Sequence, residues 1–257
     1  MTRLLYLAIF LMSASLANAN GTPSAHVRKT DQPITLDGRL DEAAWSSTEP
    51  VTGFWQHFPT DSLQSEYQTE IFLLYDDQAL YVGARCYTSG RNFVVPSLKR
   101  DYRAGGNDNI TFMFDPFNDG SNAFVFGINP LGVRREALIT EGGTDNDQFQ
   151  TSWDNKWDGT SMIHDDHWTI EIAIPFSTLR FNEGSQKWRF QCYRFDTQSN
   201  ETMTWVRIPR NQSLINLAFM GDMHWEEPLQ KHGANVAVIP YASGAWARDY
   251  EAGTPSD

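Results

Sequence analysis

The stretch TEIFLLYDDQALYVGARCY, residues 69–87, contains two runs of alternating side chains on either side of a short polar turn. In residues 69–75 and 80–87, apolar side chains recur at every second position, so they share one face of an extended strand. The intervening Asp76-Asp77-Gln78 is typical of a turn. The stretch therefore predicts an antiparallel hairpin with one buried face.

The same period of two recurs along the chain from about residue 67 to residue 223. The period of 3.6 that is typical of a helix occurs only in short pieces near residues 40–45, 96–102 and 176–181. Further strands are predicted over residues 110–114, 124–128, 133–140, 168–174, 188–196 and 201–208. Many strands at short spacing predict an all-β sandwich or barrel with short helical turns.

The composition favours one main folded domain and argues against one class of partner. The chain has 257 residues, of which 40% are hydrophobic, and this is enough for a substantial core. The formal net charge is −12. Nucleic acid is therefore not expected as a partner, because phosphate binding needs clustered lysine and arginine.

The N-terminus carries the clearest targeting signal. Arg3 is followed by an apolar run over residues 4–12 and by small residues that end in Ala17-Asn18-Ala19. This pattern is typical of a secretory signal peptide over residues 1–19, and the apolar run is shorter than the ~20 residues of a membrane-spanning helix. We therefore expect an exported protein of the periplasm or outer membrane.

The two cysteines, Cys86 and Cys192, fall on inward-facing positions of their predicted strands. Export permits a disulfide, and two buried thiols on separate strands are the alternative. The sequence leaves both open.

Catalytic machinery is only weakly indicated. The sequence has no serine-nucleophile elbow, no paired-histidine zinc helix and no phosphate-binding glycine loop. Asp154, Asp158, Glu136 and Glu171 are carboxylates from which a glycosidase pair could come, and such a pair must lie roughly 5 to 10 Å apart. A chain with 32 acidic residues offers such pairs by chance, so we favour a non-enzyme and keep O-glycosyl hydrolysis as an alternative.

The segment PITLDGRLDEAAW, residues 33–45, resembles the opening motif of family 9 carbohydrate-binding modules. The resemblance continues in order through TEIFLLYDDQALYVGARCY, DNITFMFD, FGINPLG, WDNKW and WTIEIAIPFSTLRF. It covers about residues 24–225. It is closer still to the N-terminal domain of poorly characterised bacterial outer-membrane proteins, in which such a module precedes a β-barrel.

The resemblance implies an antiparallel β-sandwich over residues 24–225, often with bound calcium. It implies an exported, non-catalytic domain that binds polysaccharide or oligosaccharide and serves polysaccharide capture or catabolism at the cell envelope. A structural cap for an outer-membrane barrel is the alternative. Residues 226–257 would then be a linker and, over residues 234–248, the first barrel strand, so we expect the chain to be part of a longer protein.

Xylanase-linked members of the family hold a terminal sugar between two tryptophans. This sequence has Gly105-Gly106 and residues 214–216 at the corresponding places, so the tryptophan clamp is missing. Because the family places its ligand beside the first of these positions, we look there for stacking rings and polar partners for hydroxyl groups. The predicted ligand-binding residues are Tyr102, Arg103, Asp108, Trp153 and Asp154.

The turn after residue 114 is the candidate calcium site. Asp115, Asn118, Asp119 and Asn122 supply the hard oxygen ligands that calcium prefers. A hydrogen-bonded turn rich in Asp and Asn needs no metal, and this is the alternative. Trp157 belongs to the scaffold pattern shared by the resembling proteins, so we expect it to be structural.

Overall fold

The computed structural model describes residues 22–230, 243–244 and 246 of the chain. The signal peptide predicted over residues 1–19 lies outside this part, and so does most of the strand predicted over residues 234–248. In the part that is described, no helix is both long and apolar enough to span a membrane.

Strands dominate the described residues, and the helical segments are short 3-10 turns. The strands are β1 (Ser24–Lys29), β2 (Trp55–Phe58), β3 (Thr69–Tyr75), β4 (Ala79–Tyr87), β5 (Asn109–Asp115), β6 (Ala123–Ile128), β7 (Arg134–Ile139), β8 (Phe149–Gln150), β9 (Asp158–Ile163), β10 (His167–Pro175), β11 (Lys187–Asp196), β12 (Glu201–Thr204) and β13 (Gly221–Trp225). The 3-10 turns are η1 (Trp45–Ser47), η2 (Glu141–Gly143), η3 (Asn146–Gln148), η4 (Phe176–Thr178) and η5 (Leu217–Phe219). The all-β prediction is confirmed, whereas the piece near residues 96–102 forms no helix.

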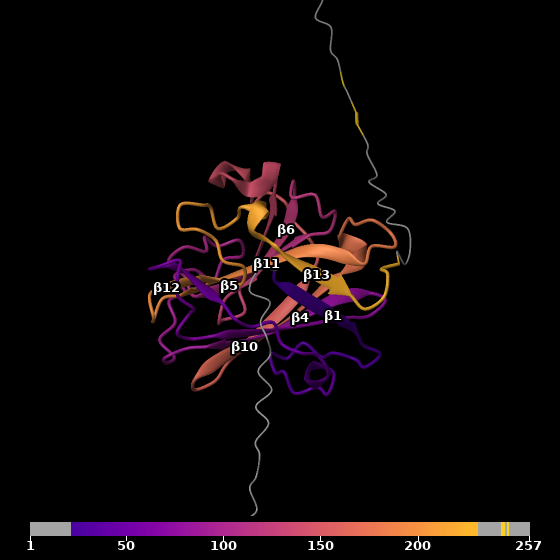
Figure 1. The fold of residues 1–257 in the computed structure, drawn as a ribbon. Coiled ribbons are helices and arrows are strands. Elements are labelled where there is room, and N and C mark those ends of the chain that lie inside the picture. The colour runs from indigo at the N-terminus through magenta and orange to yellow at the C-terminus, as the bar shows by residue number, and fades with distance from the viewer. Residues whose placement is uncertain (1–21, 231–242, 245, 247–257) are drawn as a thin grey trace, which may run out of the picture.

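The strands form one continuous sheet that folds into two layers (Figure 1). The first layer runs β8-β7-β6-β5-β11-β13, with β12 beside β11 and β2 beside β12, and the second layer runs β3-β4-β10-β9. β1 joins the layers, because residues 24–27 pair with β13 and residues 28–29 pair with β3. Both pairings of β1 are parallel, so the sandwich is mixed rather than wholly antiparallel as expected.

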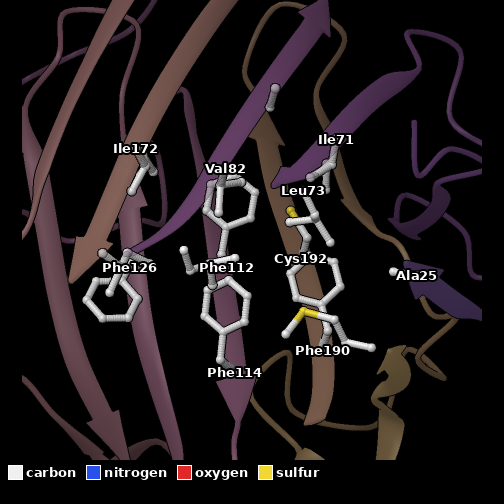
Figure 2. Packing of buried hydrophobic residues seen from close by; sticks show 14 of the residues in the cluster. Ala25, Ile71, Leu73, Val82, Phe112, Phe114, Phe126, Ile172, Phe190 and Cys192 are labelled. Carbon is white, nitrogen blue, oxygen red and sulfur yellow. The ribbon is translucent and has the colours of Figure 1, made fainter. Parts of the chain in front are cut away.

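The main core lies between the two layers (Figure 2). Phe112, Phe126 and Phe190 of the first layer share one buried cluster with Val82 and Ile172 of the second layer. These side chains occupy the alternate positions that the sequence pattern marked as inward. Their burial supplies the main driving force of folding, at about 25 cal/mol for each Å² of apolar surface removed from water.

Both cysteines lie in this core as free thiols. Cys86 is on β4 of the second layer and Cys192 is on β11 of the first layer. Burial raises the pKa of Cys86 to about 12, so the thiol stays protonated at neutral pH. Of the two alternatives that the sequence left open, the structure shows the buried thiols.

The PITLDGRLDEAAW segment covers the outer face of the second layer. A Cβ atom on Gly83 would lie 2.7 Å from Leu40 Cδ2 and 3.1 Å from Trp45 Cζ3, so this strand position has no room for a side chain. The fully buried Glu171 ties the segment down, because its carboxylate accepts the Gly38 N–H at 2.8 Å and the Trp45 indole N–H at 3.0 Å. The segment is therefore a structural cover of the second layer, and the Glu171 carboxylate anchors it to β10.

Glu171 should make stability depend on pH. Its burial raises its pKa to about 7, although the hydrogen bonds from Gly38, Trp45 and Asp37 favour the charged form. The folded protein therefore holds the proton more tightly than the unfolded chain, where a glutamate has a pKa of about 4.3. The resulting stability is complete below about pH 4.3 and is lost as the pH rises through about 7.

We expect urea unfolding of the parent to show a free energy that falls with pH across this window, by up to about 1.4 kcal/mol per pH unit. Glu171→Gln cannot titrate and should lose most of that slope. The readout is the slope rather than the absolute stability, because the amide places an N–H₂ group among donors. Equal slopes in the two proteins would show that folding does not raise the pKa of Glu171.

Candidate functional site

A row of side chains crosses the outer face of the first layer. Arg135 of β7 is paired in register with Gly127 of β6. Gly127 is paired with Thr111 of β5, which is paired with Tyr193 of β11. A Cβ atom on Gly127 would lie 2.7 Å from Arg135 Cγ and 2.8 Å from Thr111 Oγ1. The glycine therefore leaves room for the Arg135 side chain to lie across the sheet toward Tyr193.

Aromatic side chains hold the guanidinium of Arg135 in place. Arg135 is 5% exposed, and its Nη1 donates a hydrogen bond to Tyr193 Oη at 3.2 Å. Its Cζ lies 5.1 Å from the centre of the Phe149 ring and 5.8 Å from the centre of the Tyr102 ring. A cation over a ring face is attracted by the ring quadrupole. One positive charge is thus fixed on this face.

A cavity of about 560 Å³, called here the outer cavity, lies over this row. Residues 144–149, which follow β7, form one wall, and residues 213–215, which precede β13, form another. The rings of Phe149 and Phe195 are half-buried in the lining, so each keeps some surface for a ligand. The lining also includes Arg103, Arg135, Asp145, Tyr193 and Ile215.

Asp101 determines where the predicted residues Tyr102 and Arg103 lie. Its backbone N–H donates to Arg134 O at 3.1 Å and its Oδ1 accepts the Glu136 N–H at 3.2 Å, so it pairs with the free edge of β7. Tyr102 then enters the outer face, where its ring is 6% exposed and supports the guanidinium described above. That ring is not the open platform that we predicted, whereas exposed Arg103 does line the outer cavity.

Trp153 and Asp154 lie on the opposite face of the same layer. The Trp153 ring is half-buried, with its centre 5.1 Å from the ring centre of Phe124 and 6.0 Å from that of Phe126. Both phenylalanines belong to the main core, so Trp153 does not line the outer cavity. Asp154 forms an ion pair with Arg100 at 3.4 Å. The structure therefore separates two pairs of residues that we expected at one site.

Glu136 satisfies the indole N–H of the buried Trp157. Glu136 Oε2 accepts the Trp157 indole N–H at 3.0 Å and the Arg100 Nε–H at 3.2 Å, and burial raises the pKa of Glu136. Trp157 is buried in the main core, which confirms the structural interpretation. Glu136 and Glu171, two of the four candidate catalytic carboxylates, are each bound by protein donors. The other two, Asp154 and Asp158, form ion pairs with Arg100 and Arg134, and none of the four lines the outer cavity.

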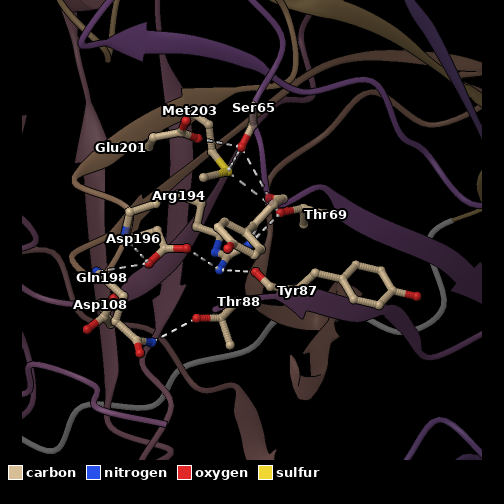
Figure 3. Close-up of polar contacts among 12 residues, drawn as sticks. Ser65, Thr69, Tyr87, Thr88, Asp108, Arg194, Asp196, Gln198, Glu201 and Met203 are labelled. Atoms are coloured by element: carbon tan, nitrogen blue, oxygen red, sulfur yellow. Dashed lines mark hydrogen bonds and ion pairs between the residues drawn. The ribbon is translucent and has the colours of Figure 1, made fainter. Parts of the chain in front are cut away.

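Asp108 belongs to a polar cluster away from the outer cavity (Figure 3). Its Oδ2 accepts the Val94 N–H and the Thr197 hydroxyl, both at 2.6 Å. Its Oδ1 accepts the Thr197 N–H at 2.8 Å. Both carboxylate oxygens accept hydrogen bonds within the protein. Asp108 therefore fixes the chain ahead of β5 and is not free to bind a sugar hydroxyl.

The candidate calcium turn joins β5 to β6 and is closed by its own amides. The buried Asp115 carboxylate accepts N–H bonds from Phe117 at 3.1 Å, Asn118 at 2.8 Å and Gly120 at 2.8 Å. Across the described residues, no three His, Cys, Asp or Glu side chains are grouped to hold a metal ion. The rest of the predicted set is exposed: Asn118, Asp119 and Asn122. This arrangement does not fit calcium, because its central carboxylate is already satisfied.

We expect a chelator to leave the thermal midpoint of unfolding unchanged, because three backbone amides already satisfy Asp115. Circular dichroism melts in excess EDTA and in excess calcium chloride measure this. A drop of several degrees in EDTA that calcium reverses and magnesium does not would restore the calcium site.

Several residues of the outer cavity were not singled out from the sequence: Arg135, Phe149, Tyr193, Phe195 and Ile215. One local signal was available, because Arg135 is an arginine at an apolar-face position of a predicted strand. Its meaning depends on the register that places Gly127 opposite it. The wall residues come from turns whose position over the sheet depends on the whole fold.

Comparison by sequence identifies no relative: no family model matches the chain, and no curated protein matches it. Solved structures do match. A family 9 carbohydrate-binding module from Caldicellulosiruptor kristjanssonii in complex with cellotriose is 15% identical, with a TM-score of 0.54 over 86% of this chain and 100% of that one. A family 9 module from the same organism in complex with glucose is 15% identical, with a TM-score of 0.54 over 83% of this chain and 100% of the other.

A third structure, a proposed carbohydrate-binding protein from Bacteroides uniformis, is 13% identical, with a TM-score of 0.61 over 80% of this chain and 100% of that one. At these identities the likeness shows the fold alone. The chain therefore has the β-sandwich fold of family 9 carbohydrate-binding modules, as the resemblance implied.

Proposed function

We propose that the chain is a non-catalytic carbohydrate-binding domain whose ligand occupies the outer cavity. The observation that carries this proposal is the meeting of residues 103–104 with residues 213–215 in one cavity lining. These segments adjoin the two places where the resembling family holds its sugar. The tryptophans are missing there, and the half-buried Phe149 and Phe195 supply ring surface that can cover the C–H face of a sugar.

The lining suits binding better than hydrolysis. A glycosidase needs two carboxyl groups across its cleft. Among the described residues that line the outer cavity, Asp145 is the only carboxylate, and its Oδ1 accepts the Asn146 N–H at 2.7 Å. Polar groups of the cavity can therefore bind the hydroxyl groups of a sugar. The described lining contains no second carboxyl group that could protonate a leaving group.

We further propose that the domain captures polysaccharide at the cell envelope after export. Support comes from the charged, apolar and small-residue regions of residues 1–19. Expression of the full chain in a Gram-negative host, followed by fractionation and intact-mass measurement, tests this. A mature protein that begins at Asn20 in the periplasmic or membrane fraction is expected, and an uncleaved cytoplasmic chain would contradict export.

Phe149→Ala should weaken carbohydrate binding, because it removes a ring from the cavity wall. The loss of one aromatic contact is worth on the order of 1 kcal/mol, or about fivefold in affinity. A glycan array identifies the ligand, and calorimetric titration compares the variants. Phe117→Ala is the matched control, because Phe117 is exposed on the turn between β5 and β6 and does not line the outer cavity. Equal affinity of all three proteins would place the site elsewhere.

A further inference from the structure

The outer cavity contains two arginines that lack acidic partners. Arg135 is almost fully buried, and Arg103 is exposed at the rim. Within the described part of the chain, no carboxylate forms an ion pair with either one. The other deeply buried arginine, Arg194, does have an acidic partner, Asp196, at 3.1 Å. Of these two deeply buried arginines, Arg135 is therefore the one without a carboxylate partner among the described residues.

The Arg135 charge is only partly compensated by its surroundings. The guanidinium has five N–H donors, and within the described part of the chain one of them is used, in the hydrogen bond to Tyr193 Oη. The Tyr102 and Phe149 rings favour the cation, but ring faces accept no conventional hydrogen bond. Burial of a charge is costly unless the charge is paired. A ligand with an anionic group would supply the missing partner.

The acidic residue in the lining does not supply it. Asp145 is exposed and starts the η3 turn, where its side chain accepts the Asn146 N–H and the backbone N–H of Gln148 in a capping box. Its carboxylate is therefore used in hydrogen bonds within the cavity wall and does not pair with either arginine. The uncommitted charge in the cavity is positive, although the whole chain has a formal net charge of −12.

We propose that the outer cavity selects sugars that carry an anionic group, with Arg135 as the buried anchor and Arg103 as the second cation. This inference rests on the proposed carbohydrate function and names its ligand class. The anion is a uronate carboxylate or a sulfate ester. Both have planar or tripodal oxygens that a guanidinium binds through two parallel N–H bonds, which a neutral hydroxyl cannot match. The half-buried Phe149 and Phe195 then contact the sugar ring.

The test uses ligands that differ only in charge. Trigalacturonic acid and trimannuronic acid are titrated beside their methyl esters, which keep the rings and remove the charge. Sulfated galactan trimers form the second arm, and cellotriose and xylotriose are the neutral references. We expect at least one anionic ligand to bind tenfold or more tightly than its neutral counterpart. Its affinity should fall as sodium chloride is added, because salt screens the attraction.

Arg135→Met keeps the aliphatic stem over Gly127 and removes the charge. It should weaken the anionic ligand tenfold or more, by a larger factor than any neutral sugar, and abolish most of the salt dependence. Arg180→Met is the control, because it removes one exposed charge that does not line the outer cavity. If Arg135→Met does not fold, Arg103→Met at the rim should still reduce both the affinity and its salt dependence.

The outcomes separate the two proposals. Binding of cellotriose or xylotriose at least as tight as that of every anionic ligand would overturn the selectivity and leave carbohydrate binding intact. Failure of every glycan to bind would overturn both. An anionic ligand that binds Arg135→Met, Arg103→Met and the parent with equal affinity would also overturn the inference. The anionic group of the ligand would then be bound outside the outer cavity.

Discussion

Replacing Arg194 with methionine should lower the free energy of unfolding by about 3–5 kcal/mol, the range expected when one partner of a buried ion pair is removed. Arg194 lies on β11 and is 1% exposed. Its Nη2 donates to Tyr87 O at 2.6 Å and to Asp196 Oδ2 at 3.1 Å, and its Nη1 donates to Thr69 Oγ1 at 3.1 Å (Figure 3).

The large effect follows from where these partners lie. Thr69 and Tyr87 belong to β3 and β4 of the second layer, whereas Arg194 and Asp196 belong to β11 of the first layer. One guanidinium therefore joins the two layers at their ends and neutralises a carboxylate inside the protein. Methionine fills a similar volume but leaves the Asp196 charge without its cation and takes the guanidinium donor away from the Tyr87 carbonyl.

Urea unfolding measures the loss as a lower midpoint at an unchanged slope. Adding Asp196→Asn to Arg194→Met should recover part of the stability, because the amide is neutral and its oxygen can still accept the Gln198 N–H, which lies 3.1 Å from Asp196 Oδ1. The exposed Arg180→Met should stay within about 0.5 kcal/mol of the parent. If Arg194→Met costs no more than Arg180→Met, the guanidinium does not hold the layers together.

The local strands could be predicted from the sequence because alternation is a property of neighbouring residues. The hairpin of β3 and β4 pairs Leu73 with Val82, as the quoted stretch requires. β1 was missed because only Ala25 and Val27 alternate in it and both of its partners are remote: β3 starts at Thr69 and β13 starts at Gly221. Such long-range pairing leaves no periodic signal, and it is what makes the sheet mixed.

The exposure of single aromatic residues could not be predicted in the same way. Tyr102 and Trp153 both lie in irregular segments, where no period fixes the direction of a side chain. Tyr102 is covered because Asp101 pairs with the edge of β7, and Trp153 is half-covered because it packs on Phe124. Each result depends on which distant strand edge or core surface a segment meets. The outer cavity therefore lies beside the segments where the sequence predicted a ligand, residues 103–104 and 213–215. Most of the side chains that line it are not the predicted ones.

The conformation of Gly143 should be as important to the outer cavity as the charges in it. Gly143 has a φ of +66°, and a Cβ atom there would collide with the Ile215 carbonyl oxygen and lie 2.8 Å from Ile139 Cγ2. Gly143 immediately precedes one wall of the outer cavity, and Ile215 belongs to the other. Gly143→Ala should therefore push the walls apart and cost about 3 kcal/mol or more, from backbone strain together with steric overlap.

Gly184→Ala is the matched control, because Gly184 also has a positive φ, +77°, but no atom lies within 4 Å of its added Cβ. It should cost only about 1–2 kcal/mol, the strain of a left-handed residue with a side chain. The difference between the two variants in urea unfolding isolates the steric contact between the walls. Ligand titration adds a second readout: Gly143→Ala should lose affinity at temperatures where it remains folded, and Gly184→Ala should not. Equal stability and affinity in both variants would mean that the walls move freely and that their contact does not shape the cavity.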